Sequence, residues 1–445
     1  MSAIGVATKT LLKGRDPMTS ALTIASVAVP HAMLLAVVGG VLAFRERARA
    51  MDLGMGNGEL YVFLSSFAAV LLIVPILSMG AAAVRLGMSR RSEHLAILRL
   101  IGVTGSQMRV ACVADSLIQT LIGIGVGSVL YAVTLPAWSL LSFHNRPLGV
   151  AEMWVGVAGL ALAAAVMAVL VALSAWIAVR EVAVTPLGVV RHANAKRVSP
   201  VMVLLVVVLV VAWIVGGSVV NAFPQAVAVA VICSILALIL AGVNAVGAWS
   251  VGLLGRIMAT LARRPHMLIA GRRLADDPRS VWRSFGAVAL VGFIVGCLYP
   301  VISIIVHSGG EGAQPEEAMV GRDIHTGLLL TLSMTVVLAA VSTAVNQAVR
   351  LLDTISETRA LSYAGAPNSL VDRARRSEVG IPATLIIGGA MGVGLVFLTP
   401  ILGDAPTGGL LLIVSTLGGF LIAAVGVILA ASESTRALRS HLLRD

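Results

Sequence analysis

Two short polar stretches, SEHLAILRLIGVTG at residues 92–105 and SETRALSYAGAPNS at residues 356–369, each follow a long apolar run. Each has apolar residues at helical spacing beside charged ones, which predicts a short amphipathic helix that ends at a glycine. Such a helix is too short to cross a membrane, so we expect it at the cytoplasmic surface. One copy would fit an ordinary connecting helix. Two copies at equivalent positions favour docking onto a partner with two-fold symmetry.

The composition around these stretches is that of a membrane protein. Hydrophobic residues make up 58% of the 445 residues and charged residues only 12%, which excludes a soluble protein with a polar surface. Apolar windows of about 19 residues predict an all-α polytopic fold with ten transmembrane helices. The predicted spans lie near 19–44, 59–86, 110–135, 151–179, 201–220, 225–249, 284–306, 324–349, 380–401 and 408–431. Cys112, Cys233 and Cys297 lie in or beside apolar runs, so we expect neither a disulfide nor a metal site.

The basic residues predict the orientation of the spans. With a cytoplasmic N-terminus, all but five of the 32 lysine and arginine residues fall on the cytoplasmic side. The five exceptions are Arg45, Arg47, Arg49, Arg146 and Arg322. An even number of spans then places both termini in the cytoplasm. Topology and contact with membrane lipid explain the net charge of +11, so we expect no nucleic-acid partner.

The two halves of the chain repeat one another. An offset of 263 residues sets Gly102 on Gly365 and Leu98 on Leu361, and it pairs the second and third predicted spans with the eighth and ninth. An Asp-Pro pair also precedes the first span of each half. We therefore predict two four-helix units, at 1–191 and 256–445, separated by a linker and a central two-helix insert at 192–255.

The repeated stretch resembles a signature of the FtsX-like permeases of the ABC transporter superfamily, in their ten-span, bacitracin-type or macrolide-exporter-like branch. The signature reads roughly Arg-Glu-x-x-x-Leu-Arg-x-x-Gly-Ala and follows the second span of each unit. HLAILRLIGVTGSQM at 94–108 is similar to it, ETRALSYAGAPNSLV at 357–371 is similar in part, and AVREVAVTPLGVVR at 178–191 is similar to the tail of such units. The sequence departs from the signature at His94, which stands in place of Glu, and at Ser362 and Tyr363, which replace Leu-Arg.

The resemblance implies that the two short helices are coupling helices, which insert into the clefts of a separate ABC-type ATPase. Two copies of that subunit, carrying ATP and Mg, would bind one permease chain. The implied coupling residues are Glu93, His94, Leu95, Leu98, Arg99, Gly102, Glu357, Leu361 and Gly365. Because the chain has no Gly-x-x-x-x-Gly-Lys-Ser/Thr phosphate loop, we expect it to bind no cofactor, to have no catalytic residues and not to be an enzyme itself. A stroke of the ATPase would enter the membrane through residues 104–116 and 367–379.

Few polar groups lie inside the predicted spans. Pro30 and His31 interrupt the first span and Pro75 the second, which makes these residues candidates for a hinge or a substrate path. His31 is explained more simply as a core histidine bonded to a carbonyl that Pro30 frees. The glycine-rich stretches at 123–127 and 388–394 predict close packing of helices rather than phosphate loops.

Three functions fit these observations. The first is the permease subunit of an ATP-driven exporter of a hydrophobic or amphiphilic compound, such as a drug, an antimicrobial peptide or a lipid. The second is a transducer that transports nothing and controls an extracellular partner, although the outer loops at 45–59 and 307–323 are too short to fold alone. The third is an ion-driven transporter, which normally has paired carboxylates inside the membrane. Lysine is scarce beside arginine, as is typical of GC-rich bacteria, and this indicates a bacterial cytoplasmic membrane.

Overall fold

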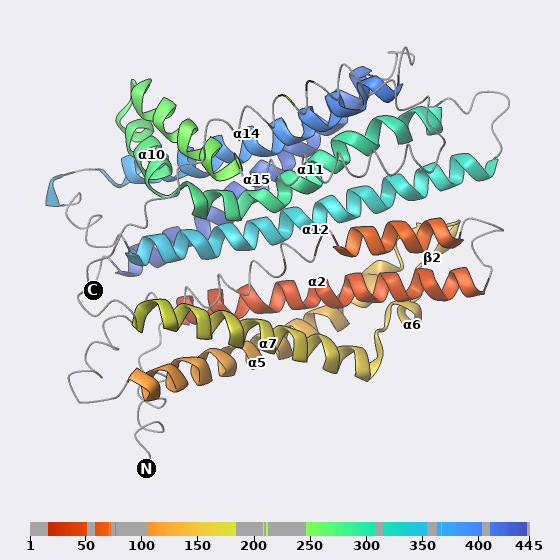
Figure 1. The fold of residues 1–445 in the computed structure, drawn as a ribbon, viewed down its shortest axis with the longest axis horizontal. Coiled ribbons are helices and arrows are strands. Elements are labelled where there is room, and N and C mark those ends of the chain that lie inside the picture. The colour runs from red at the N-terminus through yellow and green to blue at the C-terminus, as the bar shows by residue number, and fades with distance from the viewer. Residues whose placement is uncertain are drawn as a thin grey trace. The chain divides into compact units, whose positions relative to one another are not determined.

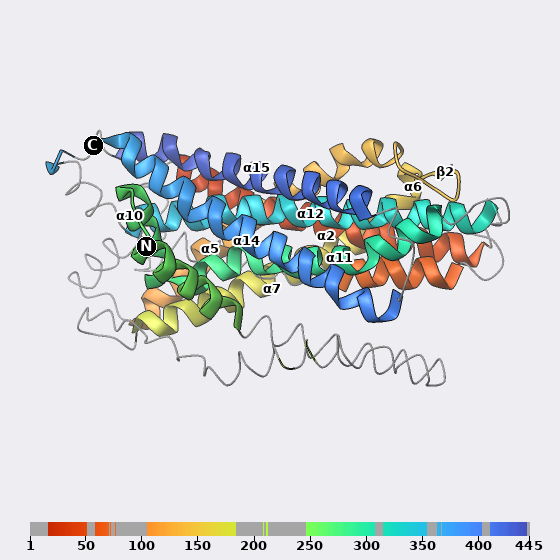
Figure 2. The same cartoon turned by 90° about the horizontal axis from the view of Figure 1, so that it is seen from above.

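The structure, a computed structural model, describes residues 17–50, 58–70, 105–183, 246–307, 315–353, 363–365, 367–402 and 410–442, with single residues at 72, 76, 208 and 211. Long helices make up almost all of this part of the chain (Figure 1, Figure 2). They are α2 (Pro17–Arg49), α5 (Gly105–Trp138), α6 (Val150–Met153), α7 (Gly156–Ala183), α10 (Pro265–Asp276), α11 (Pro278–His307), α12 (Pro315–Asp353), α14 (Asn368–Leu402) and α15 (Leu410–Leu442). Residues 58–70 and 246–260 are also helical. Strands β1 (Ser142–Phe143) and β2 (Arg146–Pro147) form an antiparallel hairpin between α5 and α6.

Six helices of the described chain are long and apolar enough to cross a membrane. They are Ser20–Arg49, Ser116–Trp138, Val150–Leu173, Met319–Val349, Ser369–Phe397 and Val414–Glu433, and they coincide with six of the ten predicted spans. Two shorter apolar helices, Gly58–Val70 and Ser284–Cys297, lie within the predicted second and seventh spans. The predicted fifth and sixth spans lie almost wholly outside the described residues. A helical, membrane-spanning chain is therefore confirmed, whereas the number of ten spans and the domain boundaries stay predictions.

Proline sets the start of the first long helix in each half. α2 begins at Pro17 and α11 at Pro278, and each proline belongs to one of the two Asp-Pro pairs. Proline suits the first helical position because its φ is already helical and its missing N–H would have no partner there. The Asp-Pro pair that is repeated in the two halves of the sequence therefore marks the same feature in both, the start of a long helix.

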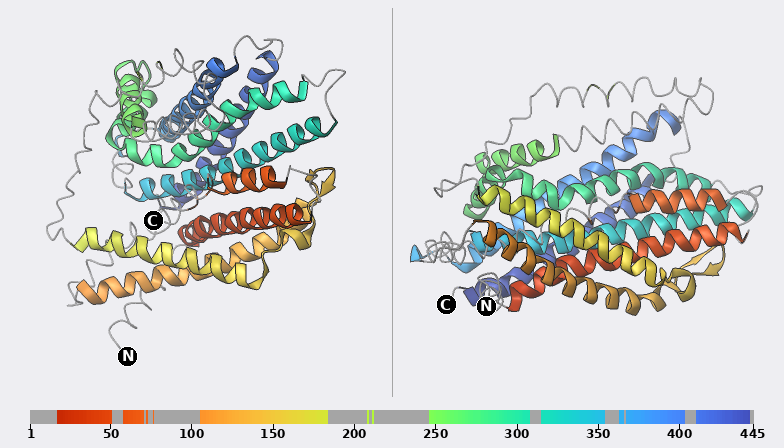
Figure 3. Two further views of the ribbon diagram at one scale, coloured as in Figure 1. Left: turned by 45° about the vertical axis from the view of Figure 1, so that its right-hand side comes forward. Right: turned by 60° about the horizontal axis from the view of Figure 1, so that its bottom comes forward.

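One group of packed helices consists of α2, α5, α6 and α7 (Figure 3). α2 runs along α5 with two glycines at the contact. A Cβ placed on Gly123 would lie 2.7 Å from the Cβ of Val27, and one on Gly127 would lie 2.6 Å from the carbonyl oxygen of Ala28. The contacting residue numbers rise together, so the two helices are parallel. This direction fits a second span that crosses the membrane between them.

A second group contains α10, α11 and α14. Gly296 of α11 lies against the backbone of Met391, and Gly394 of α14 lies against the carbonyl oxygen of Phe293. These two helices are also parallel and also approach through glycines. The prediction that the stretches at 123–127 and 388–394 serve helix packing is confirmed, because hydrogen in place of a side chain is what lets the backbones touch.

We expect Gly127→Ala to destabilise the protein by about 2 kcal/mol, because the added methyl group has no room beside the Ala28 carbonyl. The matched control is Gly125→Ala, two residues away on α5, where a Cβ meets nothing within 4 Å. Thermal unfolding of the detergent-solubilised protein measures both. Equal melting temperatures for the two variants would show that the glycine contact does not hold α2 to α5.

Candidate functional site

Most of the predicted coupling residues lie outside the described part of the chain. These are Glu93, His94, Leu95, Leu98, Arg99, Gly102, Glu357 and Leu361, and the predicted hinge residue Pro75 lies outside it as well. Gly365, Pro30 and His31 lie inside it. What the structure adds is the geometry of the segments that directly follow the two motifs, and of the helices to which they lead.

The second motif ends at a left-handed glycine. Tyr363 is helical and 89% exposed, and it is followed by a turn in which Gly365 has a φ of +79°. Any residue with a Cβ would be strained there by roughly 1–2 kcal/mol. Glycine at the position after a helix end relieves this strain, so Gly365 marks the end of the predicted coupling helix and frees the chain to begin α14 at Asn368.

The helix after each motif continues into the membrane without a break. α5 begins at Gly105 and has 34 residues, and α14 begins at Asn368 and has 35. At about 1.5 Å per residue, each is roughly 50 Å long, which exceeds the thickness of the bilayer core. The predicted entry segments are thus the first turns of the third and ninth spans themselves. A displacement at the start of such a helix reaches its far end.

A buried ion pair attaches the start of α14 to α10. The carboxylate of Glu378 is 2% exposed and lies 3.9 Å from the guanidinium of Arg273 on α10. Because a buried carboxylate is costly without a charged partner, the pair fixes the position of α10 on α14. Arg273 belongs to a different helix from Glu378, and no spacing along the sequence links the two.

Pro30 and His31 lie where α2 meets α5. His31 is fully buried, and its Nε2 lies 3.2 Å from Oγ of Ser128 on α5. The hydrogen bond of the ring therefore joins two helices, whereas the sequence favoured a carbonyl that Pro30 frees. α2 continues through Pro30 as one helix. This geometry gives His31 a place in the α2–α5 contact, close to the crossing at Gly127, and a role in a substrate path stays a prediction.

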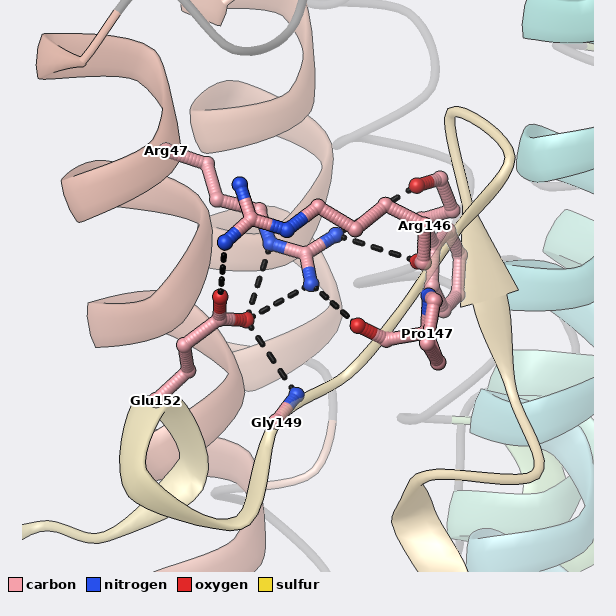
Figure 4. Close-up of polar contacts among 6 residues, drawn as sticks. Arg47, Arg146, Pro147, Gly149 and Glu152 are labelled. Carbon is pink, nitrogen blue, oxygen red and sulfur yellow. Dashed lines mark hydrogen bonds and ion pairs between the residues drawn. The ribbon is translucent and has the colours of Figure 1, made fainter.

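At its far end α2 is fastened to the loop between α5 and α7 by Arg47. The side chain of Arg47 is 3% exposed, and it donates to Oε2 of Glu152 from Nε at 2.9 Å and from Nη2 at 2.6 Å (Figure 4). The carbonyl oxygens of Phe143, Arg146 and Pro147 accept from its two terminal nitrogens. A planar guanidinium suits this arrangement, because its donors point to one carboxylate and three carbonyls at once. We call Arg47, Glu152 and residues 142–147 the outer clasp, because the predicted orientation places them on the outer side of the membrane.

The turn of the hairpin brings these carbonyls together. His144 and Asn145 have φ values of 55° and 58°, which are the left-handed conformations that a two-residue type I′ turn needs, and Asn is favoured there. The guanidinium of Arg146 lies 3.4 Å from the second carboxylate oxygen of Glu152. Glu152 is therefore shared by two arginines and balances the charge of the buried one.

Aromatic residues of α2 and α5 pack against the outer clasp. The hydroxyl group of Tyr131 on α5 donates to the carbonyl of Met153 and accepts from the N–H of Val155 at 3.2 Å. Phe44 meets Phe143 of β1 edge-on, with ring centroids 5.1 Å apart. These contacts tie both ends of the loop, at β1 and after α6, to the helices beneath it.

Sequence reasoning missed the outer clasp. The letters HNRP between two apolar runs are a turn signal that could have revealed the hairpin. Arg47 lies in the run RERAR, where nothing distinguishes the one arginine that is buried from its exposed neighbours. Its partner Glu152 is 105 residues away, and no local pattern links the two.

The apolar helices of the described chain define a multi-pass membrane protein. Residues 65–184 match the family model described as FtsX-like permease C-terminal, a segment that contains the first motif, α5, the loop of the outer clasp and α7. The resemblance to FtsX-like permeases that the sequence shows is therefore confirmed over this segment. The matched segment indicates a membrane component of the ABC permease type, and proteins of that family associate with an ABC ATPase and are normally not enzymes themselves. No curated protein and no solved structure matches the chain.

We expect Arg47→Met to lower the free energy of unfolding by about 3 kcal/mol, because three carbonyls lose their donor and the Glu152 carboxylate keeps only Arg146 and the N–H of Gly149. Arg47→Lys should recover only part of this loss, since an ammonium group cannot reach all the acceptors. Arg49→Met, which removes an exposed arginine two residues away, is the control. Thermal unfolding in detergent measures the three variants, and Arg47→Met melting together with Arg49→Met would contradict the role given to the outer clasp.

Proposed function

We propose that this chain is the permease subunit of an ATP-driven transporter in a bacterial cytoplasmic membrane, with both termini in the cytoplasm. It exports a hydrophobic or amphiphilic compound, such as a drug, an antimicrobial peptide or a lipid, or extracts it from the bilayer. Two copies of a separate ABC-type ATPase subunit bind one chain, and they hold the ATP and Mg that supply the work. The chain itself binds no nucleotide.

The observation that carries the proposal is that one long continuous helix, α5 or α14, follows each motif in the sequence and runs into a membrane span. α5 starts at Gly105, directly after the first motif, and α14 starts three residues after Gly365. A coupling helix seated in an ATPase cleft would move the start of its span with it. Because α5 contacts α2 through glycines and the outer clasp, α2 would follow, and the movement would reach the outer side.

The small size of the described outer parts supports a small or membrane-dissolved substrate. Between α5 and α7 the outer segment is a two-residue turn, two short strands and the four-residue helix α6. These elements are packed against Arg47, Phe44 and Tyr131. They offer no folded domain that could enclose a large ligand, and the lipid-facing surfaces of the spans are the remaining route for a hydrophobic one.

A second candidate function is that of a transducer, and the outer clasp favours it. The clasp is a rigid structure on the outer side, connected to the first motif by one helix. The movement driven by the ATPase would reach an extracellular partner bound there even if no compound crossed the membrane.

We expect Leu98→Ala to weaken retention of the ATPase subunit by about 30-fold, which is the factor that about 2 kcal/mol for a buried interface anchor represents. Leu361→Ala should act in the same direction and more weakly, and Arg99→Glu more strongly, because it reverses a charge beside the interface. The matched control is Leu121→Ala, which truncates a leucine that α5 exposes within its span. The measurement is the amount of ATPase subunit that co-purifies with each variant from membranes containing equal amounts of the chain.

Unchanged retention in both Leu98→Ala and Arg99→Glu would show that the first motif is only a connector, and robust ATP hydrolysis by the purified chain alone would also contradict the proposal. The two candidate functions are separated in vesicles of phosphatidylcholine and phosphatidylglycerol that contain the chain and its ATPase. ATP-dependent movement of a fluorescent phospholipid or a hydrophobic dye supports the exporter. ATP turnover without movement of either probe supports the transducer.

A further inference from the structure

A hairpin of two helices precedes α11, at the end of the second group where α11 and α14 both begin (Figure 1). Its arms are residues 246–260 and α10, joined by residues 261–264. The arms cross at two glycines: a Cβ on Gly255 would lie 2.8 Å from the carbonyl oxygen of Gly271, and a Cβ on Gly271 would lie 2.8 Å from that of Gly255. The backbones therefore touch, and the hairpin is a compact unit. We call residues 246–276 the basic hairpin.

The basic hairpin lies next to the point where the chain enters the membrane. α10 ends at Asp276 and α11 begins at Pro278, and the apolar stretch of α11 starts at Ser284. Only six residues of α11, 278–283, precede that stretch, a length of about 9 Å. α10 has 12 residues, too few to span the bilayer itself. It is placed to lie at the membrane surface.

The exposed surface of the basic hairpin combines apolar and basic side chains. The exposed apolar residues, between 38% and 74% accessible, are Leu253, Ile257, Leu261 and Leu268. The exposed basic residues are Arg256, Arg263, Arg264 and Arg272. The exposed acidic residues, Asp276 and Asp277, lie at the opposite end of α10 from Arg264. A partner for this surface must therefore be apolar and negatively charged at once.

We infer that the basic hairpin binds anionic phospholipid in the membrane leaflet at which α11 begins. Its arginines contact the phosphate-bearing headgroups, and its leucines enter the boundary of the acyl chains. Arginines flanking an apolar stripe are the combination that holds a helix in an anionic interface. An acidic protein surface would satisfy the arginines but would leave four large apolar side chains, a few residues from a membrane span, without an apolar neighbour.

Lipid bound here would also act on α14. Arg273 belongs to the basic hairpin, and its ion pair with Glu378 fixes α10 to the first turns of α14. A headgroup that anchors α10 at the interface thereby sets the depth at which α14 starts. This effect on coupling rests on the proposed function, whereas the lipid binding does not.

The test measures contact between the basic hairpin and lipid by the quenching of a fluorophore attached to the hairpin. Leu268→Cys, in a chain whose native cysteines are replaced by serine, carries a bimane group in nanodiscs of phosphatidylcholine with phosphatidylglycerol. One of the two lipids has brominated acyl chains, at equal mole fraction in the two preparations. We expect brominated phosphatidylglycerol to quench about twofold more strongly than brominated phosphatidylcholine, because anionic lipid gathers around the arginines. Bimane at Leu121→Cys, in the membrane span of α5, should be quenched equally by both.

Variants that change the charge of the hairpin test whether its arginines cause the stronger quenching by phosphatidylglycerol. Changing Arg263, Arg264 and Arg272 together to Gln should abolish it, and changing the same three to Lys should retain it. Arg322→Gln, which neutralises an exposed arginine at the other end of a span, should leave it unchanged. No quenching by either lipid, equal quenching by both, or a preference that survives the triple Gln variant would each overturn the inference. None of these outcomes depends on an ATPase, so failure here is distinct from failure of the proposed function.

Discussion

The close approach of α2 to α5 is the contact on which the first group of helices depends. In a bilayer the lipid tails are as apolar as the helix surfaces, so helices associate through tight packing and a few polar contacts rather than through the hydrophobic effect. Gly123 and Gly127 provide the tight packing, and the hydrogen bond between His31 and Ser128 lies beside it. The same solution recurs between α11 and α14, where Gly296 and Gly394 meet the opposing backbone. In both groups the helix that follows a motif is held to the helix that begins at an Asp-Pro pair.

The outer clasp extends this connection to the far end of α2. Burying the guanidinium of Arg47 is favourable only because Glu152 and three carbonyls surround it, and those groups all belong to the loop that follows α5. α2 and α5 are therefore joined in two places. Glycine contacts join them along their length, and the ion pair and hydrogen bonds of Arg47 join them at their far ends. A helix pair joined in this way has little freedom to slide. It is suited to carry a displacement from the first motif through the membrane as one body, which is the mechanical property that the proposed function requires.

The sequence predicted those features that depend on local pattern. Apolar length predicted the six helices that can cross a membrane, and the Asp-Pro pairs marked the starts of α2 and α11. Glycine spacing predicted the packing faces, and the first motif predicted the similarity to FtsX-like permeases that residues 65–184 show. Contacts between residues that are far apart in the sequence could not be predicted from it. Arg47 and Glu152, or Arg273 and Glu378, are ordinary charged residues in the sequence, and their burial is decided by helices that pack from elsewhere in the chain. His31 was recognised as unusual, but its partner Ser128 lies 97 residues away. The coupling residues at 93–102 lie outside the described part of the chain, so their role stays a prediction.

Locking α2 to α5 tests the central claim most directly, namely that the two helices move as one body. Val27→Cys and Gly123→Cys place two cysteines on facing positions of the α2–α5 contact. The Cβ atoms would lie 2.7 Å apart, so the helices must separate by about 1 Å to reach the spacing of a disulfide, and the reduced variant is the reference that contains this shift. The measurement is ATP hydrolysis by the complex with its ATPase subunit in nanodiscs, before oxidation, after it, and after renewed reduction. The account predicts that the oxidised, cross-linked complex retains the turnover of the reduced one, because the bond joins parts that do not move relative to each other. A turnover that collapses on oxidation and returns on reduction would show that α5 slides along α2 during the cycle, and would contradict the account.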